Sequence, residues 1–328
     1  MSDGRTPADE GDPNTDPLRW FLLAGNRLAV AGVMLAGVGA GVLATGLLGI
    51  ATVTTPGRVV WYLNGTVNGL LTLVPITVGV NQIVLSHEFG SIQDLYERRT
   101  DVSEFRDRVE DRTGVTVSSP RPAEFFETLL AGVIDTAEAL RSERRGNDEP
   151  AEYADRVLRE AERTREALSA ASGMLEPLLV VLEYDDSAQY YETRKLFSEA
   201  ETDASTDTAG NLDEIAELFA EIDAARQYLK TVVIERQLAE LSRLLIYTAI
   251  PAVAVAALGI FTYRDVAGVD LSHPALVVVA GGLLTASLVP LAVPSAYILR
   301  VATIARQTAA FGPFVYDAEL ALGEDRDR

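Results

Sequence analysis

Residues 28–53 read LAVAGVMLAGVGAGVLATGLLGIATV, a run without a single Asp, Glu, Lys or Arg. A helix of about 20 residues crosses a hydrocarbon core of about 30 Å. Three further uncharged runs of that length follow, at Trp61–Leu85, Leu244–Tyr263 and Pro274–Leu299. Uncharged apolar runs of about 18 residues or more are typical of membrane spans. The sequence therefore predicts an all-α membrane protein with four transmembrane helices.

The four predicted spans form two hairpins, separated by a long polar segment. Hairpin 1 occupies residues 19–86 and hairpin 2 residues 243–300. Residues 87–242 between them are expected to fold as an acidic helical domain. Residues 1–18, acidic and rich in proline, are expected to form a disordered tail, and residues 301–328 a second tail.

The arginines predict which side of the membrane each segment occupies. Arg58 and Arg264 flank the spans on one side, whereas eight arginines flank them on the other. Loops rich in Lys and Arg stay in the cytoplasm. Both termini and the polar segment are therefore expected to be cytoplasmic, and the protein to reside in the cell membrane. The eight are Arg19, Arg27, Arg98, Arg99, Arg236, Arg243, Arg300 and Arg306.

The polar segment carries helical patterns that continue into the spans. Apolar residues recur every three or four positions from Ile215 to Val233. No Gly or Pro follows until Pro251, which predicts one helix of about 40 residues or more from Asn211 into the third span. Residues 87–112 resemble a matching extension of the second span, so the pair is expected to form a coiled-coil-like stalk.

The charge is concentrated in the polar segment and limits the classes of partner. The formal net charge is -20, and residues 87–242 hold 36 acidic and 18 basic side chains. Such a surface disfavours nucleic acid and anionic lipid as partners. Only Lys195 and Lys230 accompany the 26 arginines. An acidic, lysine-poor chain is typical of proteins that work near molar salt, where the Debye length is about 3 Å.

The sequence predicts no cofactor, metal site or enzymatic activity. The chain has no cysteine, and its two histidines, His87 and His273, fall on opposite sides of the membrane. Cysteine and histidine metal sites within one subunit are thereby disfavoured. We find no nucleotide-binding motif and no nucleophile paired with a base.

A polar stripe along the second span is the first candidate site. Asn64, Asn68, Thr72, Gln82 and Ser86 share one helical face with Pro75 and Gly79. Polar side chains in lipid need protein partners or water, so this face is expected to point into the bundle or toward an aqueous path. Two interpretations remain open: hydrogen bonding between helices, and the lining of a solute pathway.

Two further features of the spans attract functional hypotheses. Gly37, Gly41, Thr45 and Gly49 form a face of small residues on the first span, which would let another helix approach closely. That helix belongs either to the same subunit or to a second one. In the fourth span, Pro290 and Pro294 predict a bend, which serves as a structural kink or a gating hinge.

Taken over its whole length, the chain resembles uncharacterised polytopic membrane proteins of haloarchaea. The composition, the plan of two hairpins and the closing stretch RVATIARQTAAFGPF at 300–314 carry this resemblance. It implies no activity and no functional residue. Two hypotheses follow: a self-associating membrane scaffold or signalling component that docks a cytoplasmic protein, and an oligomeric ion channel or small-solute pathway. Both imply a homo-oligomer in a lipid bilayer.

Overall fold

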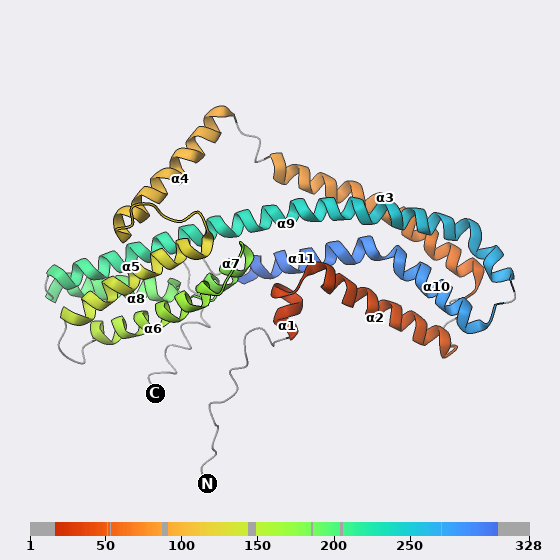
Figure 1. Ribbon diagram of the computed structural model, residues 1–328, viewed down its shortest axis with the longest axis horizontal. Coiled ribbons are helices and arrows are strands. Elements are labelled where there is room, and N and C mark those ends of the chain that lie inside the picture. The colour runs from red at the N-terminus through yellow and green to blue at the C-terminus, as the bar shows by residue number, and fades with distance from the viewer. Residues whose placement is uncertain are drawn as a thin grey trace, which may run out of the picture. The chain divides into compact units, whose positions relative to one another are not determined.

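The computed structural model describes residues 17–50, 52, 54–86, 91–143, 149–184, 186–203, 206–269 and 271–307. These residues are almost entirely helical and include no strand (Figure 1). The predicted tails lie largely outside them, although residues 17 and 18 begin a helix and the last helix continues to Gln307. The elements are α1 (Pro17–Arg19), the π-helix η1 (Trp20–Ala24), α2 (Arg27–Leu47), α3 (Pro56–Ser86), α4 (Ile92–Thr113), α5 (Pro122–Glu143), α6 (Glu149–Ser169), α7 (Leu175–Val181), α8 (Asp186–Asp203), α9 (Thr206–Gly268), α10 (His273–Ser287) and α11 (Val289–Gln307).

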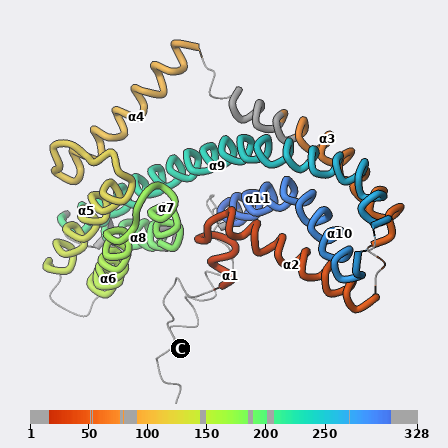
Figure 2. The backbone as a smooth tube through the Cα atoms, turned by 45° about the vertical axis from the view of Figure 1, so that its right-hand side comes forward, coloured from red at the N-terminus to blue at the C-terminus, as the bar shows by residue number. Residues whose placement is uncertain are grey.

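The chain divides into two compact units. The first, here called the membrane unit, comprises Met1–Phe89 and Glu235–Ala305, and the second, the polar unit, comprises Gly90–Ile234 and Arg306–Arg328. The helix α9 contributes its first half to the polar unit and its second half to the membrane unit (Figure 2).

Among the described residues, three helices are long and apolar enough to cross a membrane, and a bent pair makes a fourth if it is counted as one span. The three are Arg27–Leu47, Pro56–Ile76 and the apolar part of α9, and the pair is α10 with α11. The predictions of an all-helical chain and of helices that can span a membrane are confirmed for the described residues. The first helix is shorter than the predicted run to Val53, because the chain turns at Gly49, where φ is 70°.

The two predicted stalk helices differ in the structure. The continuous helix expected from Asn211 is confirmed, because α9 runs unbroken through 63 residues and includes Pro251. The prediction that residues 87–112 extend the second span as one helix is wrong, because α4 is a separate helix that begins at Ile92. Its start is fixed by a capping box, in which the Ser91 side chain accepts from the Asp94 amide and the Asp94 carboxylate accepts from the Ser91 amide.

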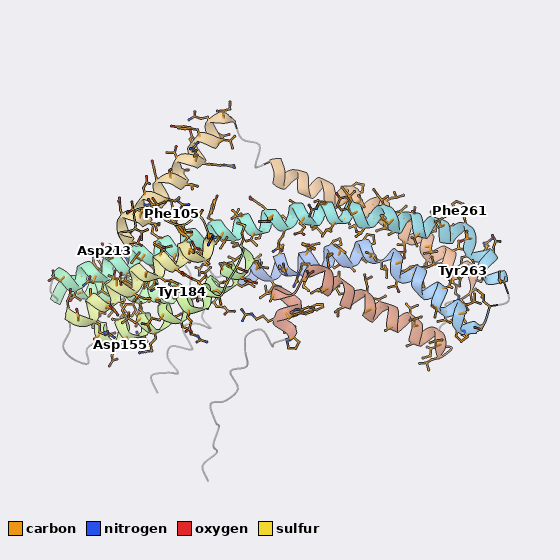
Figure 3. The ribbon with its side chains drawn as sticks, viewed as in Figure 1. Phe105, Asp155, Tyr184, Asp213, Phe261 and Tyr263 are labelled. Carbon is orange, nitrogen blue, oxygen red and sulfur yellow. The ribbon has the colours of Figure 1, made fainter. Side chains whose placement is uncertain are left out.

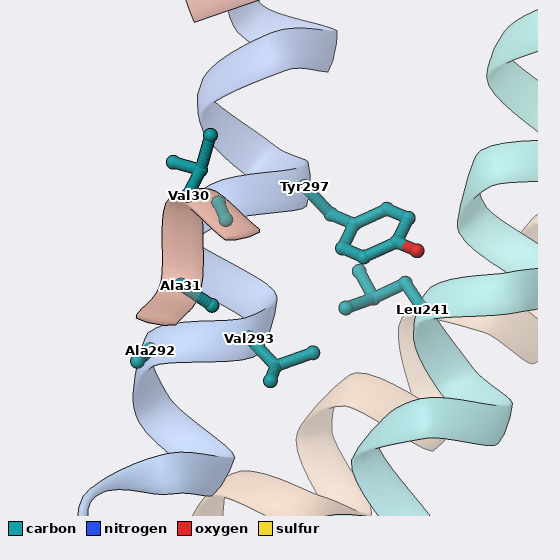
Figure 4. Close-up of a cluster of buried hydrophobic side chains, with 7 residues drawn as sticks. Val30, Ala31, Leu241, Ala292, Val293 and Tyr297 are labelled. Carbon is teal, nitrogen blue, oxygen red and sulfur yellow. The ribbon is translucent and has the colours of Figure 1, made fainter. Parts of the chain in front are cut away.

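Two apolar clusters of described residues help to hold the membrane unit together. In one, Val30 of α2 joins Val293 and Tyr297 of α11 and Leu241 of α9, and Leu241 lies beside Tyr297 (Figure 4). In the other, Leu63 of α3 packs with residues of α9 and α10, among them Tyr263. The membrane part of α9 has an inner and an outer side (Figure 3). Tyr263 is buried, whereas Phe261 points away from the helix bundle. Each helix therefore has a defined inner face.

The fourth predicted span is bent by 47° between α10 and α11. The break lies at Leu288, two residues before Pro290. A proline lacks the amide that would bond to residue 286, and its ring clashes with that residue's carbonyl. Pro294, by contrast, lies inside α11 without interrupting it.

The polar unit has an apolar core of its own. The helices α5 and α6 pack together, and buried residues such as Leu129, Val157 and Phe219 line the inner faces of α5, α6 and α9. Arg226 of α9 is buried and donates to the carbonyl oxygens of Val181 and Tyr184, at 3.3 Å each. That contact ties the segment after α7 to α9.

Candidate functional site

The buried face of α3 determines where its polar stripe points. Val59, Leu63 and Leu70 are at most 4% exposed and share one side of the helix. Leu63 meets α9 closely, since a Cβ added at Gly259 would lie 2.8 Å from its Cδ1 atom. The opposite side of α3 therefore faces away from the bundle.

The predicted polar residues occupy that outward side. Asn64, Asn68 and Thr72 are all exposed in the single chain. Gly65 and Gly69 lie beside them, and a Cβ added at either would meet no atom within 4 Å. We call Asn64, Gly65, Asn68, Gly69 and Thr72 the outer face of α3. Within one described chain, no helix covers it.

The remaining members of the stripe can be placed only in part. Gln82 and Ser86 belong to α3, but their side chains lie outside the described residues. Thr72 donates to the carbonyl oxygen of Asn68 at 3.0 Å, so its hydroxyl is satisfied within the helix. The carboxamides of Asn64 and Asn68 are consequently the polar groups of the outer face that most need a partner.

The small-residue face of α2 is also turned outward. Gly37 and Gly41 are exposed, and Thr45 donates to the Gly41 carbonyl oxygen at 2.8 Å. Gly49 lies beyond the helix, where its positive φ serves the turn. The close packing inside the chain uses a different glycine, Gly39, whose added Cβ would lie 3.2 Å from Thr285 Oγ1. Four-residue spacing alone could not identify it.

A cluster of buried arginines lies where α2 and α11 meet, and sequence reasoning had assigned these residues only to the membrane boundary. Arg27 is 3% exposed and donates through Nε and one terminal nitrogen to the Gly25 carbonyl oxygen, at 2.9 and 2.7 Å. It also reaches the carbonyls of Trp20, Phe21, Leu22 and Ala296. The guanidinium therefore supplies donors to carbonyls at the end of the π-helix and to one carbonyl of α11.

Arg300 joins the same cluster from α11. It is 7% exposed and also donates to the Gly25 carbonyl oxygen, while its Nε atom has no hydrogen-bond partner. The carboxylate of Glu240 interacts electrostatically with Arg300 and Tyr297. The sequence feature that could have indicated this cluster is the position of Arg27 and Arg300 directly at the ends of the first and fourth predicted spans.

The polar unit has a cavity whose lining includes three arginines and two glutamates. A cavity of about 530 Å³ is lined by Arg156, Arg159 and Arg163 of α6, together with Glu160 and Glu183. Arg156 pairs with Glu192, and the two carboxylates in the lining offset the remaining arginines. Within the part of the chain that the structure describes, no group of three or more His, Asp or Glu side chains is placed to hold a metal ion.

The fold and these faces define a helical membrane protein with a polar helical domain. The chain belongs to a family of unknown function, DUF7972, whose model matches residues 5–326. No curated protein and no solved structure matches the chain. The family assignment therefore covers nearly the whole chain and leaves its activity to be inferred from the faces described above.

Proposed function

We propose that this protein is a self-associating membrane scaffold or signalling component, in which the outer face of α3 joins subunits and the polar unit docks a cytoplasmic protein. The single observation that carries the proposal is the exposure of Asn64 and Asn68 on a membrane helix whose other side carries the buried residues Val59, Leu63 and Leu70. A carboxamide in hydrocarbon lacks hydrogen-bond partners and is costly there.

A second copy of the same helix supplies the missing partners. An asparagine carboxamide both donates and accepts, so two such groups can pair across a symmetric interface. Gly65 and Gly69, beside them, let the two backbones approach closely. Hydrogen bonds between membrane helices contribute about 0.6 to 2 kcal/mol each. Together these features support association through α3.

We also propose on which side of the membrane the termini and the polar unit lie. The excess of arginines on one side of the spans supports cytoplasmic termini and a cytoplasmic polar unit in the cell membrane. The acidic, lysine-poor composition supports a working environment of high salt, as in haloarchaea. The concentration of charge in residues 87–242 supports a solvent-facing surface on which a protein partner docks.

The alternative is an oligomeric channel or small-solute pathway lined by the same face. A ring of subunits could turn Asn64, Asn68 and Thr72 toward a central path, continued by Gln82 and Ser86. No Asp, Glu, Lys or Arg occurs within α3 after Arg58, so such a path would present amide and hydroxyl dipoles rather than charges. The number of subunits separates the two proposals.

The test is the mass of the purified particle in detergent and high salt, by light scattering with the detergent contribution subtracted. The double variant Asn64→Leu with Asn68→Leu is expected to convert the oligomer to a monomer. The matched variant Gly37→Leu with Gly41→Leu changes the exposed face of α2 instead and should leave the mass unchanged. Phe261→Leu, on the exposed side of α9, serves as a control for general surface changes.

Each result has a distinct meaning. A dimer that the asparagine variant dissociates supports the scaffold. A monomeric wild-type protein contradicts self-association and also the channel, because four helices can scarcely enclose an aqueous pore. A ring of four or more subunits with ion flux in liposomes, lost in the asparagine variant, favours the pathway. If only the α2 variant dissociates the particle, the subunit interface lies on α2 and the assignment to α3 is wrong.

A further inference from the structure

Among the described residues, the first half of α4 is exposed along its whole length. Residues 91–104 are all exposed in the single chain, whereas the second half of the helix packs on α5. There Val109 is fully buried, and the ring of Phe105 lies 6.0 Å from that of Phe125. A free helical segment shorter than about 12–15 residues is marginal in water. Contact with a surface outside the described chain would therefore add to the support that this segment receives from the packed second half of α4.

The exposed segment has one strongly apolar side. Ile92 is 88% exposed, Leu95 51%, Tyr96 68% and Val102 40%. At 100° per residue, these four side chains fall on a single face, which we call the apolar face of α4. Large apolar side chains gathered on one exposed helix face mark an interaction surface.

The charges of the segment are segregated with respect to this face. Arg99 lies within it and Arg98 at its edge, and all the carboxylates of the segment lie on the opposite side of the helix. An apolar face opposite a strongly charged face is a feature of helices that lie in a membrane interface, and arginines on the apolar side can extend their charged ends to the headgroups. The acidic residues are Asp94, Glu97, Asp101 and Glu104.

The chain itself holds this segment near a bilayer. The apolar sequence of α3 continues to Leu85, and only residues 87–91 separate Ser86 from Ile92. Six Cα–Cα steps reach at most about 20 Å. The capping box at Ser91 then starts a new helix, so that α4 can take a direction different from that of α3.

We propose that residues 92–102 of α4 lie on the lipid surface as an interfacial helix. The apolar face enters the boundary between headgroups and acyl chains, and Arg98 and Arg99 reach the phosphates. The net negative charge of the polar unit disfavours anionic membranes in general, but the side of α4 that meets lipid carries only arginines. The proposal rests on the membrane spans alone and does not require self-association.

The absence of cysteine makes a direct test available in the full-length chain. Leu95→Cys places a spin label on the apolar face, and Asp101→Cys places one on the opposite side. In liposomes of zwitterionic lipid, the ratio of oxygen to nickel-chelate collision rates should exceed one at residue 95 and fall below one at residue 101. Both positions are exposed, so circular dichroism should show an unchanged fold.

A second variant shows whether the apolar face causes the insertion. Ile92→Glu with Leu95→Glu should abolish the preference for oxygen at a label on Val102→Cys. The matched pair Gln93→Glu with Thr100→Glu adds the same charge outside the apolar face, on the flank of the helix, and should preserve the preference for oxygen.

Two results would overturn the proposal. Collision ratios below one at both residue 95 and residue 101 would place the segment in water. Spin–spin broadening at residue 95 that disappears on dilution with unlabelled chains, without a preference for oxygen, would mean that a second copy covers the face. The light-scattering mass, measured on the same samples, shows independently whether subunits associate.

Discussion

Arg27 of α2 and Arg300 of α11 donate hydrogen bonds to the same carbonyl oxygen, that of Gly25. Gly25 ends the π-helix, and a Cβ there would lie 2.6 Å from the Trp20 carbonyl oxygen, so no other residue fits without a shift. The two arginines thereby attach the segment before α2 to α11. Because both side chains are almost completely buried, this junction is expected to be sensitive to substitution.

Replacement of Arg27 should destabilise the membrane unit. Arg27→Ala removes the donor to the Phe21 and Leu22 carbonyls and leaves the Gly25 carbonyl to Arg300 alone, so the free energy of unfolding should fall by about 3 kcal/mol. Arg27→Lys should restore only part of the stability, because an ammonium cannot reproduce the planar fork of donors. Thermal unfolding in detergent measures both changes. The control is Arg264→Ala, at an exposed position; an equal loss in that variant would contradict the role of the junction.

The contact between Gly259 and Leu63 should limit side-chain size at the α3–α9 crossing. Gly259→Leu overpacks this contact and should cost about 1–3 kcal/mol. Leu63→Ala in the same chain should recover part of the loss by making room, whereas alone it leaves a cavity. A double-mutant cycle by thermal unfolding gives the coupling. Gly282→Leu is the matched control, because an added Cβ there meets no atom within 4 Å. Additive effects at 63 and 259 would contradict the contact.

The bend between α10 and α11 should depend on Pro290 and not on Pro294. Pro290→Ala restores the amide and removes the ring clash, so the two helices should become more nearly collinear. Spin labels on Val279→Cys and Ile298→Cys, both exposed, should then move apart in a pulsed-dipolar distance measurement. Pro294→Ala should leave the distance unchanged. If the wild-type protein shows two distances between the labels at residues 279 and 298, the bend is a hinge that moves. A single distance indicates a fixed kink.

The buried phenol of Tyr153 should make the polar unit sensitive to alkali. Its hydroxyl hydrogen-bonds with Thr193 and donates to the Gln189 carbonyl oxygen at 3.3 Å, and burial raises its pKa above the usual value of about 10. A pKa raised in the folded state means that the stabilisation is complete below about pH 10 and is lost as the pH rises beyond it.

The substitution Tyr153→Phe tests this dependence. At neutral pH the variant should lose about 1 kcal/mol, the value of a buried hydrogen bond. Above about pH 10 this difference should narrow and then reverse, because phenylalanine cannot ionise. Denaturant unfolding followed by near-ultraviolet circular dichroism at several pH values measures it. Thr193→Val retains the ionisable phenol and should retain the alkaline loss. A constant difference at all pH values would contradict the prediction.

Much of the fold could be predicted from local sequence. Uncharged runs mark the membrane helices because lipid excludes charge over a fixed thickness, and the apolar periodicity with no Gly or Pro marks the continuity of α9. The break before α4 was missed, although Ser91 and Asp94 already have the spacing of a capping box. A bend was predicted from Pro290 and Pro294 together, because a proline acts on its own helix; the structure bends at Leu288, whereas α11 continues through Pro294.

The sequence by itself determined which residues share a face, since helical geometry places Asn64, Asn68 and Thr72 on one side of α3. Only the tertiary structure decided that this side points outward, because the packing of Leu63 against α9 selects the inner face. The same holds for Arg27, whose burial depends on carbonyls that α11 and the π-helix bring to it. Periodicity is a property of one helix, whereas burial depends on neighbours that are distant in the sequence.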